Sequence, residues 1–379
     1  MTRRQALALA AGGRSVAAGT PVEVESVRTR LPKELPPGVA AILARILNQQ
    51  PSSINTDWFG TMPLLGALQW RRRGVREVEP FAKVWLEHHL RTRDVARYSG
   101  NRSRLIWAGD IPLTTYAGHF GMSLVCEEMA SQFGDTRARR VATDLAAIVL
   151  HRTARNRLGL VGHDDTADFA IPDVTFFVVS ALMVGALLDP RNSAAYCDQA
   201  LYQLRTSIDT FLIEDTGLAK TLYRSDGVGK TYWTRASGWL LWAITGMLRR
   251  LDPKHAAFSG FIADLKRLVD GMIRVQEPGG GFHVLLDDPT TPLDTTGPTM
   301  FVWGVHESVR RGWLPASYRA PVYKAWDFVK ANLTAGGVLR NTYSLWALPA
   351  ENADMRVRDE TSGWAMGFVL AAANEMTLA

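Results

Sequence analysis

The feature that most constrains the fold is an alternation of two kinds of helical segment along the chain. One kind is amphipathic, with apolar residues at i, i+3 or i+4, and i+7, and charged or polar residues on the opposite side. Six such segments lie at residues 39–46, 81–88, 141–149, 197–204, 261–269 and 322–329. Each predicts a helix with one face against a core and the other face in water.

The second kind of segment is apolar on nearly every side. Each begins with small, polar and aromatic residues, and the six aromatic anchors recur at intervals of 49 to 70 residues. Such an interval holds two helices and their loops. The anchors are Phe59, Phe120, Phe169, Trp239, Phe301 and Trp364. Because a helix that is apolar all round must be covered all round, these six are expected to lie inside the other six.

The alternation predicts an all-α fold, an (α/α)6 barrel formed by a toroid of six helical hairpins. Signals for β-strands are sparse. An open α-solenoid of the same hairpins is the alternative. The first outer helix lacks an inner partner before it, and the last inner helix lacks an outer partner after it, so closing the ring would pair them. Closure would also bring all six inner-helix N-termini, with their partial positive charges, to one end.

The 379 residues divide into an N-terminal segment, 1–34, and a single catalytic barrel domain, 35–379. The start MTRRQALALAAGG resembles a degenerate twin-arginine export signal, interrupted by Arg14. We expect a cytoplasmic protein, with Tat-type export as the alternative. No stretch reaches the roughly 18–20 apolar residues of a membrane span, so no membrane partner is expected.

Charge and cysteine content exclude several functions. The net charge of +6 is spread along the chain without a basic block, so no nucleic-acid partner is expected. Cys126 and Cys197 both lie in apolar helical patterns and are interpreted as core thiols. The sequence contains no HExxH, paired CxxC, EF-hand or GxSxG pattern. We therefore expect no metal, no cofactor and no acyl-enzyme chemistry. A monomer and a homodimer are both compatible with the sequence.

Acidic residues gather most densely just before the third inner helix, at residues 162–172. This segment contains His163, Asp164, Asp165 and Asp168. Asp165 and Asp168 would share a face if the helix had already begun there. A carboxyl surrounded by other acids, or buried, can hold a proton near neutral pH, as a general acid requires. Helix capping explains one such aspartate well and three poorly.

Other inner-helix starts also carry side chains suited to an acidic sugar. Trp233, Arg235, Gly238 and Trp239 combine a guanidinium fork, which matches a carboxylate, with indole faces that suit sugar rings. Trp58 and His119 stand at the first two inner-helix starts, and His283 follows a Gly-rich loop. We expect these residues to line a central pocket at one end of the ring.

Three of these segments resemble glycoside hydrolase families 88 and 105, the unsaturated glucuronyl and galacturonyl hydrolases. Residues 165–172 are similar to the families' Asp-Thr motif with a proline seven residues later. Residues 233–239 are similar to their W-x-R-x-x-G-W motif. Parts of the stretch 282–314, including the Met300-Phe301 pair, are similar to the late segment of these families.

The resemblance implies an (α/α)6 barrel that removes a 4,5-unsaturated uronic acid from the non-reducing end of lyase-generated oligosaccharides. An aspartate protonates C4 of the double bond and then activates water to attack C5. On this basis Asp165 is the predicted general acid and base, with Asp168 as the rival assignment. The families have a second aspartate two residues before a glycine, where this chain has His119 before Gly121.

Two other functions fit an (α/α)6 barrel. The first is an enzyme that acts on saturated glycosides, or a polysaccharide lyase, using two acids or a Tyr/His base. The second is a non-catalytic sugar-binding toroid. The loss of one family aspartate favours these alternatives, whereas Asp165 and Arg235 favour the unsaturated uronyl hydrolase.

Overall fold

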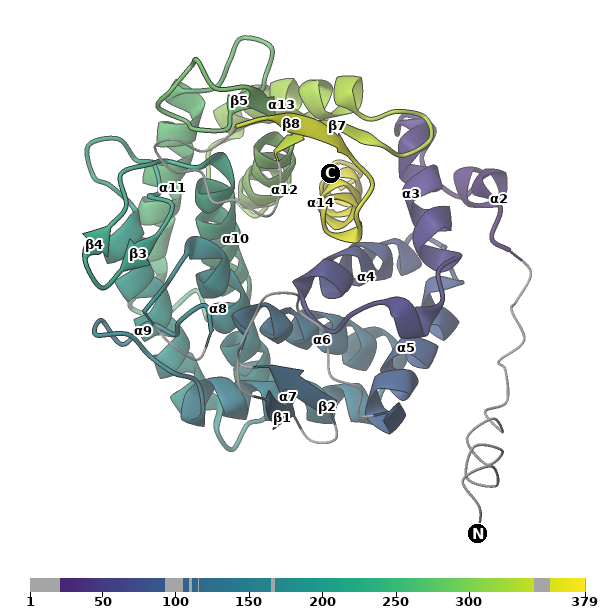
Figure 1. Ribbon diagram of the computed structural model, residues 1–379, viewed down its shortest axis with the longest axis horizontal. Helices are drawn as coiled ribbons and strands as arrows, with labels where there is room; N and C mark the ends of the chain where they lie inside the picture. Colours follow the sequence, from purple (N-terminus) through teal and green to yellow (C-terminus); the bar gives the residue numbers. More distant parts are fainter. Residues whose placement is uncertain are drawn as a thin grey trace, which may run out of the picture.

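The computed structural model describes residues 21–92, 105–108, 111–114, 116–164, 168–343 and 355–378, and it forms an (α/α)6 barrel (Figure 1). The inner helices are α4 (Trp58–Arg71), α6 (Met122–Phe133), α8 (Pro172–Leu188), α10 (Thr234–Arg250), α12 (Thr296–Arg310) and α14 (Gly363–Glu375). The outer helices are α3 (Pro37–Leu47), α5 (Val78–Thr92), α7 (Thr136–His151), α9 (Ser193–Phe211), α11 (Phe258–Arg274) and α13 (Arg319–Asn332). The predicted fold class and its two rings are confirmed.

The two kinds of helix differ as their sequences require. In α11, Phe261, Leu265 and Leu268 are buried while Lys266 is exposed, so the helix has one wet face. In α8 every residue from Val174 to Gly185 is buried, so this helix is covered on all sides. Cys126 is buried and Cys197 partly buried, and both are free thiols, as predicted.

Helices α4 and α14 close the ring by packing against each other, which decides against an open solenoid (Figure 1). Two glycines allow this close approach. A Cβ atom on Gly367 would lie 2.5 Å from the carbonyl carbon of Met62, and one on Gly66 would lie 2.9 Å from the Leu370 Cβ. The Trp70 indole Nε1 also donates a hydrogen bond to the Leu370 carbonyl at 3.1 Å.

The short helix α2 (Val24–Arg28) packs on α3 ahead of the first hairpin. Val27 and Leu31 are buried in the same core as the barrel helices, so the folded part begins before the predicted boundary at residue 35. The twin-arginine-like start at residues 1–20 lies outside the described residues. None of the helices in the described part of the chain is long and apolar enough to cross a membrane.

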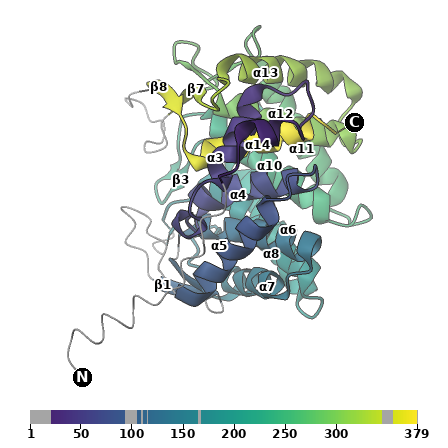
Figure 2. The same ribbon diagram turned by 90° about the vertical axis from the view of Figure 1, so that its right-hand side faces the viewer.

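In the described part of the chain, four antiparallel hairpins precede inner helices. They are β1–β2 (Leu105–Ala108, Ile111–Thr114), β3–β4 (Tyr223–Arg224, Gly227–Val228), β5–β6 (Phe282–His283, Leu293–Asp294) and β7–β8 (Leu339–Tyr343, Val357–Glu360). A 3₁₀ turn, η2 (Ala117–Gly121), leads into α6. Strands β3, β7 and β8 lie at the end of the barrel opposite the C-terminal end of α14 (Figure 2). The N-terminal end of the inner ring therefore carries the hairpins.

Main-chain hydrogen bonds connect the segments that precede successive inner helices. The bonded pairs, each given as N–H donor and carbonyl acceptor, are Ala117 to His163, Ala170 to Tyr223, Thr234 to Val284, and Thr295 to Asn341, all at 3.0 Å. Each joins the approach to one inner helix with the approach to the next. These four hydrogen bonds fix the positions along the barrel axis at which neighbouring inner helices begin.

We expect Gly367→Ala to weaken the ring closure. Its methyl group would meet the α4 backbone, which cannot rotate away, so the free energy of unfolding should fall by about 1–3 kcal/mol. Urea unfolding followed by circular dichroism measures this loss.

Gly246→Ala in α10 is the matched control, because no atom lies closer than 3.8 Å to the added Cβ. It should be neutral, or stabilising by about 0.5–1 kcal/mol because alanine favours a helix. Equal losses in the two variants would contradict the close approach of α4 and α14.

Candidate active site

Aromatic rings from three inner helices meet at the N-terminal end of the barrel. The Trp58 ring, at the start of α4, lies 5.8 Å from both Trp239 of α10 and Trp364 of α14, measured between ring centroids. Trp58 is 6% exposed. Its indole Nε1 is buried and has no hydrogen-bond partner among the described residues. The Trp233 Nε1 is in the same condition, so both indoles offer a donor to an incoming ligand.

Arg235 lies inside this cluster, in the first turn of α10. Its guanidinium carbon is 4.1 Å from the Trp233 ring centroid and 4.9 Å from that of Trp364, and Nη1 donates to the Tyr343 carbonyl at 3.1 Å. Burial lowers the pKa of Arg235 to about 10, while the charge of Asp294 acts in the opposite direction. The side chain therefore carries a positive charge at neutral pH in a site with little water.

Asp173 stands in the first turn of α8, directly after the proline that opens the helix. Its side chain stays partly exposed, and its Oδ1 accepts a hydrogen bond from the Val174 N–H at 2.7 Å. Burial raises the pKa of Asp173 to about 6, although nearby His163 and Arg235 oppose that rise. Asp173 can therefore carry a proton near neutral pH and still reach a ligand.

Asp57 is a second acid with an altered pKa. It caps α4, with its Oδ1 accepting a hydrogen bond from the Phe59 N–H at 3.0 Å. Its exposure is only 1%, and burial raises its pKa to about 6 against the effect of that bond. Asp57 is closed off from solvent and caps the start of α4, where Trp58 stands.

The described residues of the predicted acidic cluster, His163, Asp164 and Asp168, lie before α8 and not in the helix itself. The third inner helix begins at Pro172, so Asp168 lies in a bend before the helix and is exposed. Asp168 thus lies outside the helix on which a face shared with Asp165 would depend, and Asp165 lies outside the described residues. Asp164 is partly exposed, and its Oδ2 is 3.9 Å from the His163 Nδ1.

The predicted histidines occupy three different environments. The His163 ring packs between Tyr116, at 4.8 Å, and Phe169, at 5.3 Å. His119 is fully buried in η2, with its Nδ1 3.3 Å from the Thr56 hydroxyl, and burial lowers its pKa to about 3. His119 is therefore neutral at physiological pH.

His283 is held within its own hairpin, because Nδ1 contacts the Thr291 carbonyl and Nε2 lies 3.2 Å from a Glu277 carboxylate oxygen. Gly238 faces α12, where an added Cβ would lie 2.7 Å from the Met300 sulfur. Trp239 is 1% exposed and packs on Phe176 and Trp242 in the core. These three positions shape the barrel under the site.

Sequence reasoning missed Asp173, Asp57 and Asp294. A signal for Asp173 was available, because a proline followed by an acid is typical of the first turn of a helix. Asp294 had no such signal. It is fully buried, accepts a hydrogen bond from the Tyr343 N–H at 3.0 Å, and lies near Arg235 only because β6 and β7 meet in space.

The site favours proton transfer on an anionic sugar. It combines an accessible acid whose pKa is raised with a buried guanidinium and two indole N–H donors. Among the residues that the structure describes, no three His, Cys, Asp or Glu side chains gather closely enough to hold a metal ion. The closed double ring of helices, with these polar groups at its N-terminal end, places the protein in the class of α/α-barrel proteins.

The chain belongs to Glycosyl Hydrolase Family 88, whose model matches residues 103–378. It is 24% identical over 172 residues to the unsaturated rhamnogalacturonyl hydrolase YesR of Bacillus subtilis, which covers 43% of this chain and 49% of YesR. The matched region thus spans about half the length of that curated relative.

Solved structures share the fold over nearly the whole chain. A possible family 105 member from Klebsiella pneumoniae superposes with a TM-score of 0.75 at 16% identity, over 89% of this chain and 91% of that one. The unsaturated glucuronyl hydrolase of Bacillus sp. GL1, described as responsible for glycosaminoglycan degradation, gives 0.64 at 14% identity, over 89% and 93%. Both carry the fold of this chain.

The raised pKa of Asp57 predicts how stability depends on pH. The folded chain binds this proton more tightly than the unfolded chain, so Asp57 costs stability as pH rises from about 4 to above 6. Asp57→Asn removes that cost and still caps the helix. The variant should match the wild type near pH 4 and exceed it near pH 7.5 by on the order of 2–3 kcal/mol.

Denaturant unfolding at the two pH values measures this difference. Asp135→Asn, at the N-cap of α7, is the matched control, because that carboxylate accepts hydrogen bonds from two backbone N–H groups near the surface. The control should show no gain at pH 7.5. A gain of the same size in both variants would show that burial of Asp57 is not the cause.

Proposed function

We propose that this protein hydrates the double bond of a 4,5-unsaturated uronic acid at the non-reducing end of an oligosaccharide and so releases that sugar. Membership of Glycosyl Hydrolase Family 88 supports the proposal. So does the similarity to a curated unsaturated rhamnogalacturonyl hydrolase. The reaction needs an acid that is protonated near neutral pH and a positive charge for the uronate carboxylate.

The observation that carries the proposal is the state of Asp173. A general acid works best when its pKa lies near the working pH, and the pKa of Asp173 is raised to about 6. It is partly exposed at the start of an inner helix, whereas Asp57, with a similar pKa, is 1% exposed. Of these two acids, only Asp173 combines a held proton with access.

In the proposed reaction, the Asp173 carboxyl donates its proton to C4 of the double bond. The resulting carboxylate accepts a proton from a water molecule, whose oxygen forms a bond to C5. The hemiketal at C5 then rearranges, the sugar ring opens, and the remaining oligosaccharide leaves. The proton that Asp173 gives up at C4 is thus recovered from water, and the enzyme returns to its starting state.

Arg235 supplies the positive charge. With 1% exposure it is screened little by water, so its attraction for a nearby carboxylate is stronger than at a surface. The buried indole N–H groups of Trp58 and Trp233 supply donors for sugar hydroxyls. His163 packs on Tyr116 and opposes the rise that burial causes in the pKa of Asp173, which supports a role for it in the same site.

Exchanging each candidate acid for its amide identifies the proton donor. Asp173→Asn should lower kcat by about 10²- to 10⁴-fold without loss of stability, because asparagine keeps the shape but cannot transfer the proton. Asp165→Asn and Asp168→Asn are the comparison variants. The measurement is the loss of ultraviolet absorbance of the conjugated uronate in polysaccharide digested by a lyase.

If Asp165→Asn loses activity while Asp173→Asn keeps it, the acid is Asp165, and Asp173 has a structural role. If all three variants keep activity, the hydration mechanism is wrong. A wild-type protein that consumes no unsaturated uronate from pectin, ulvan or glycosaminoglycan digests would point to saturated glycosides, lyase chemistry or sugar binding alone.

For Arg235→Ala we expect mainly weaker substrate binding, with KM rising by about 10- to 100-fold, which corresponds to about 1.5–3 kcal/mol. Arg235→Lys should recover part of the loss, because it restores the charge without the planar fork. Arg224→Ala, an exposed arginine on β3, is the control for a general loss of charge. An unchanged KM with a much lower kcat would instead give Arg235 a catalytic role.

A further inference from the structure

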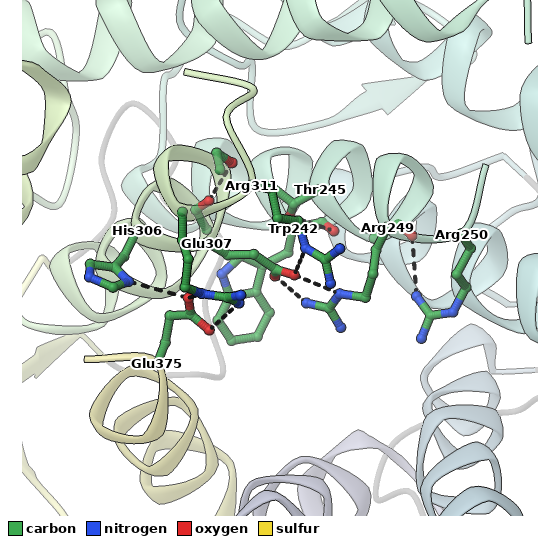
Figure 3. A network of polar contacts seen from close by, with 12 residues as sticks. Trp242, Thr245, Arg249, Arg250, His306, Glu307, Arg311 and Glu375 are labelled. Atoms are coloured by element: carbon green, nitrogen blue, oxygen red, sulfur yellow. Dashed lines mark hydrogen bonds and ion pairs between the residues drawn. The ribbon is translucent and has the colours of Figure 1, made fainter. Parts of the chain in front are cut away.

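A hollow lies at the end of the barrel opposite the candidate active site, where the inner helices finish. Its volume is about 760 Å³, and its wall includes residues from the last turns of α4, α10, α12 and α14. Figure 3 shows part of its floor, where Arg249 of α10 pairs with Glu307 of α12 and where Glu375 comes from α14. A hollow of this size can hold a small metabolite or a short oligosaccharide.

The lining of this hollow carries excess positive charge. Seven arginines and four glutamates line it, with no lysine, histidine or aspartate. The C-terminal end of a helix carries a partial negative charge on its backbone carbonyl groups. Arginines in the last turns of α4, α10 and α12 offset this charge. Some of these arginines therefore have a structural role, and the others are those without a carboxylate partner in the described part of the chain.

The four glutamates are all engaged by arginines from other elements. Arg249 Nε donates to Glu307 at 2.9 Å, Arg250 Nε to Glu127 at 3.0 Å, Arg310 Nε to Glu375 at 2.9 Å, and Arg72 Nη2 to Glu128 at 2.7 Å. These pairs join α10 to α12, α10 to α6, α12 to α14, and α4 to α6. They hold this end of the inner ring together and neutralise one another.

Arg73 and Arg139 are different. Arg73 donates only to the Thr377 carbonyl, at 3.5 Å, and Arg139 only to the Leu188 carbonyl, at 3.4 Å. Neither has a carboxylate partner among the described residues, so their full charges face the hollow. Both bonds are long, which leaves the guanidinium forks available for a better acceptor.

A layer of aromatic rings separates this hollow from the candidate active site. Trp303 lines the hollow and packs on Trp242, with ring centroids 4.7 Å apart. Trp242 packs on Trp239 at 5.4 Å, and Trp239 packs on Trp58 at 5.8 Å. A ligand in the hollow would therefore not touch Asp173 or Arg235.

We propose that this hollow is a separate binding site for a small molecule with two or more oxyanion groups, carboxylate or phosphate. Arg73 and Arg139 bind these groups through their guanidinium forks, and the paired arginines on the floor add further N–H donors. The excess of positive over negative side chains in the lining matches a ligand of two or three negative charges.

Isothermal titration calorimetry at low ionic strength tests the proposal, with citrate and pyrophosphate as probes and neutral glycerol as the blank. Wild type should bind at least one of the two anions at a single site, and added salt should weaken the binding. Arg73→Gln with Arg139→Gln should lower the affinity by about tenfold or more. A citrate or pyrophosphate preference identifies which oxyanion the site takes.

Arg140→Gln is the matched control, because Arg140 is an exposed neighbour on α7 that does not line the hollow. It should change affinity by less than about twofold. Arg139→Gln alone, at an exposed position, keeps the test valid if the double variant is unstable. The proposal is overturned if wild type binds neither anion, or if Arg140→Gln weakens binding as much as Arg139→Gln. Because binding is measured without substrate, this result is independent of the proposed hydrolase activity.

Discussion

The contact between α4 and α14 is the constraint on which the rest of the structure depends. Gly66 and Gly367 remove the side chains that would hold the first and last inner helices apart. Once these helices touch, the ring is closed, and Trp58 at the start of α4 meets Trp364 at the start of α14. Arg235, which lies over Trp364, is thereby enclosed. The candidate active site is a consequence of ring closure.

Closure also gives the two ends of the barrel different electrostatics. At the N-terminal end, the pKa values of the buried Asp57 and the partly exposed Asp173 are raised to about 6, so these two acids can hold protons. At the C-terminal end, the acids are paired with arginines. Burial would raise the pKa of Glu307, but Arg249 and Arg311 lower it below its usual value. The N-terminal end therefore suits proton transfer, whereas the paired charges at the C-terminal end do not change near neutral pH.

The sequence pattern was sufficient for the fold because it reports burial. All six amphipathic segments became outer helices, and all six apolar segments became inner helices. The pattern was less exact about where a helix begins. Asp168 was expected close to the helix start, yet α8 begins at Pro172, and that shift transfers the first-turn position to Asp173. Periodicity locates the body of a helix, whereas its first residue depends on the loop that leads into it.

The sequence by itself therefore determined the class of fold, the order of its helices and the end at which acids, indoles and an arginine gather. Only the tertiary structure decided which of these groups can act. Burial in the folded ring makes His119 neutral and raises the pKa of Asp173, against the opposing effects of Thr56 on His119 and of Arg235 on Asp173. These neighbours are distant in sequence, and a pKa is set by the charges, hydrogen bonds and solvent within a few ångströms, which only the folded ring brings together.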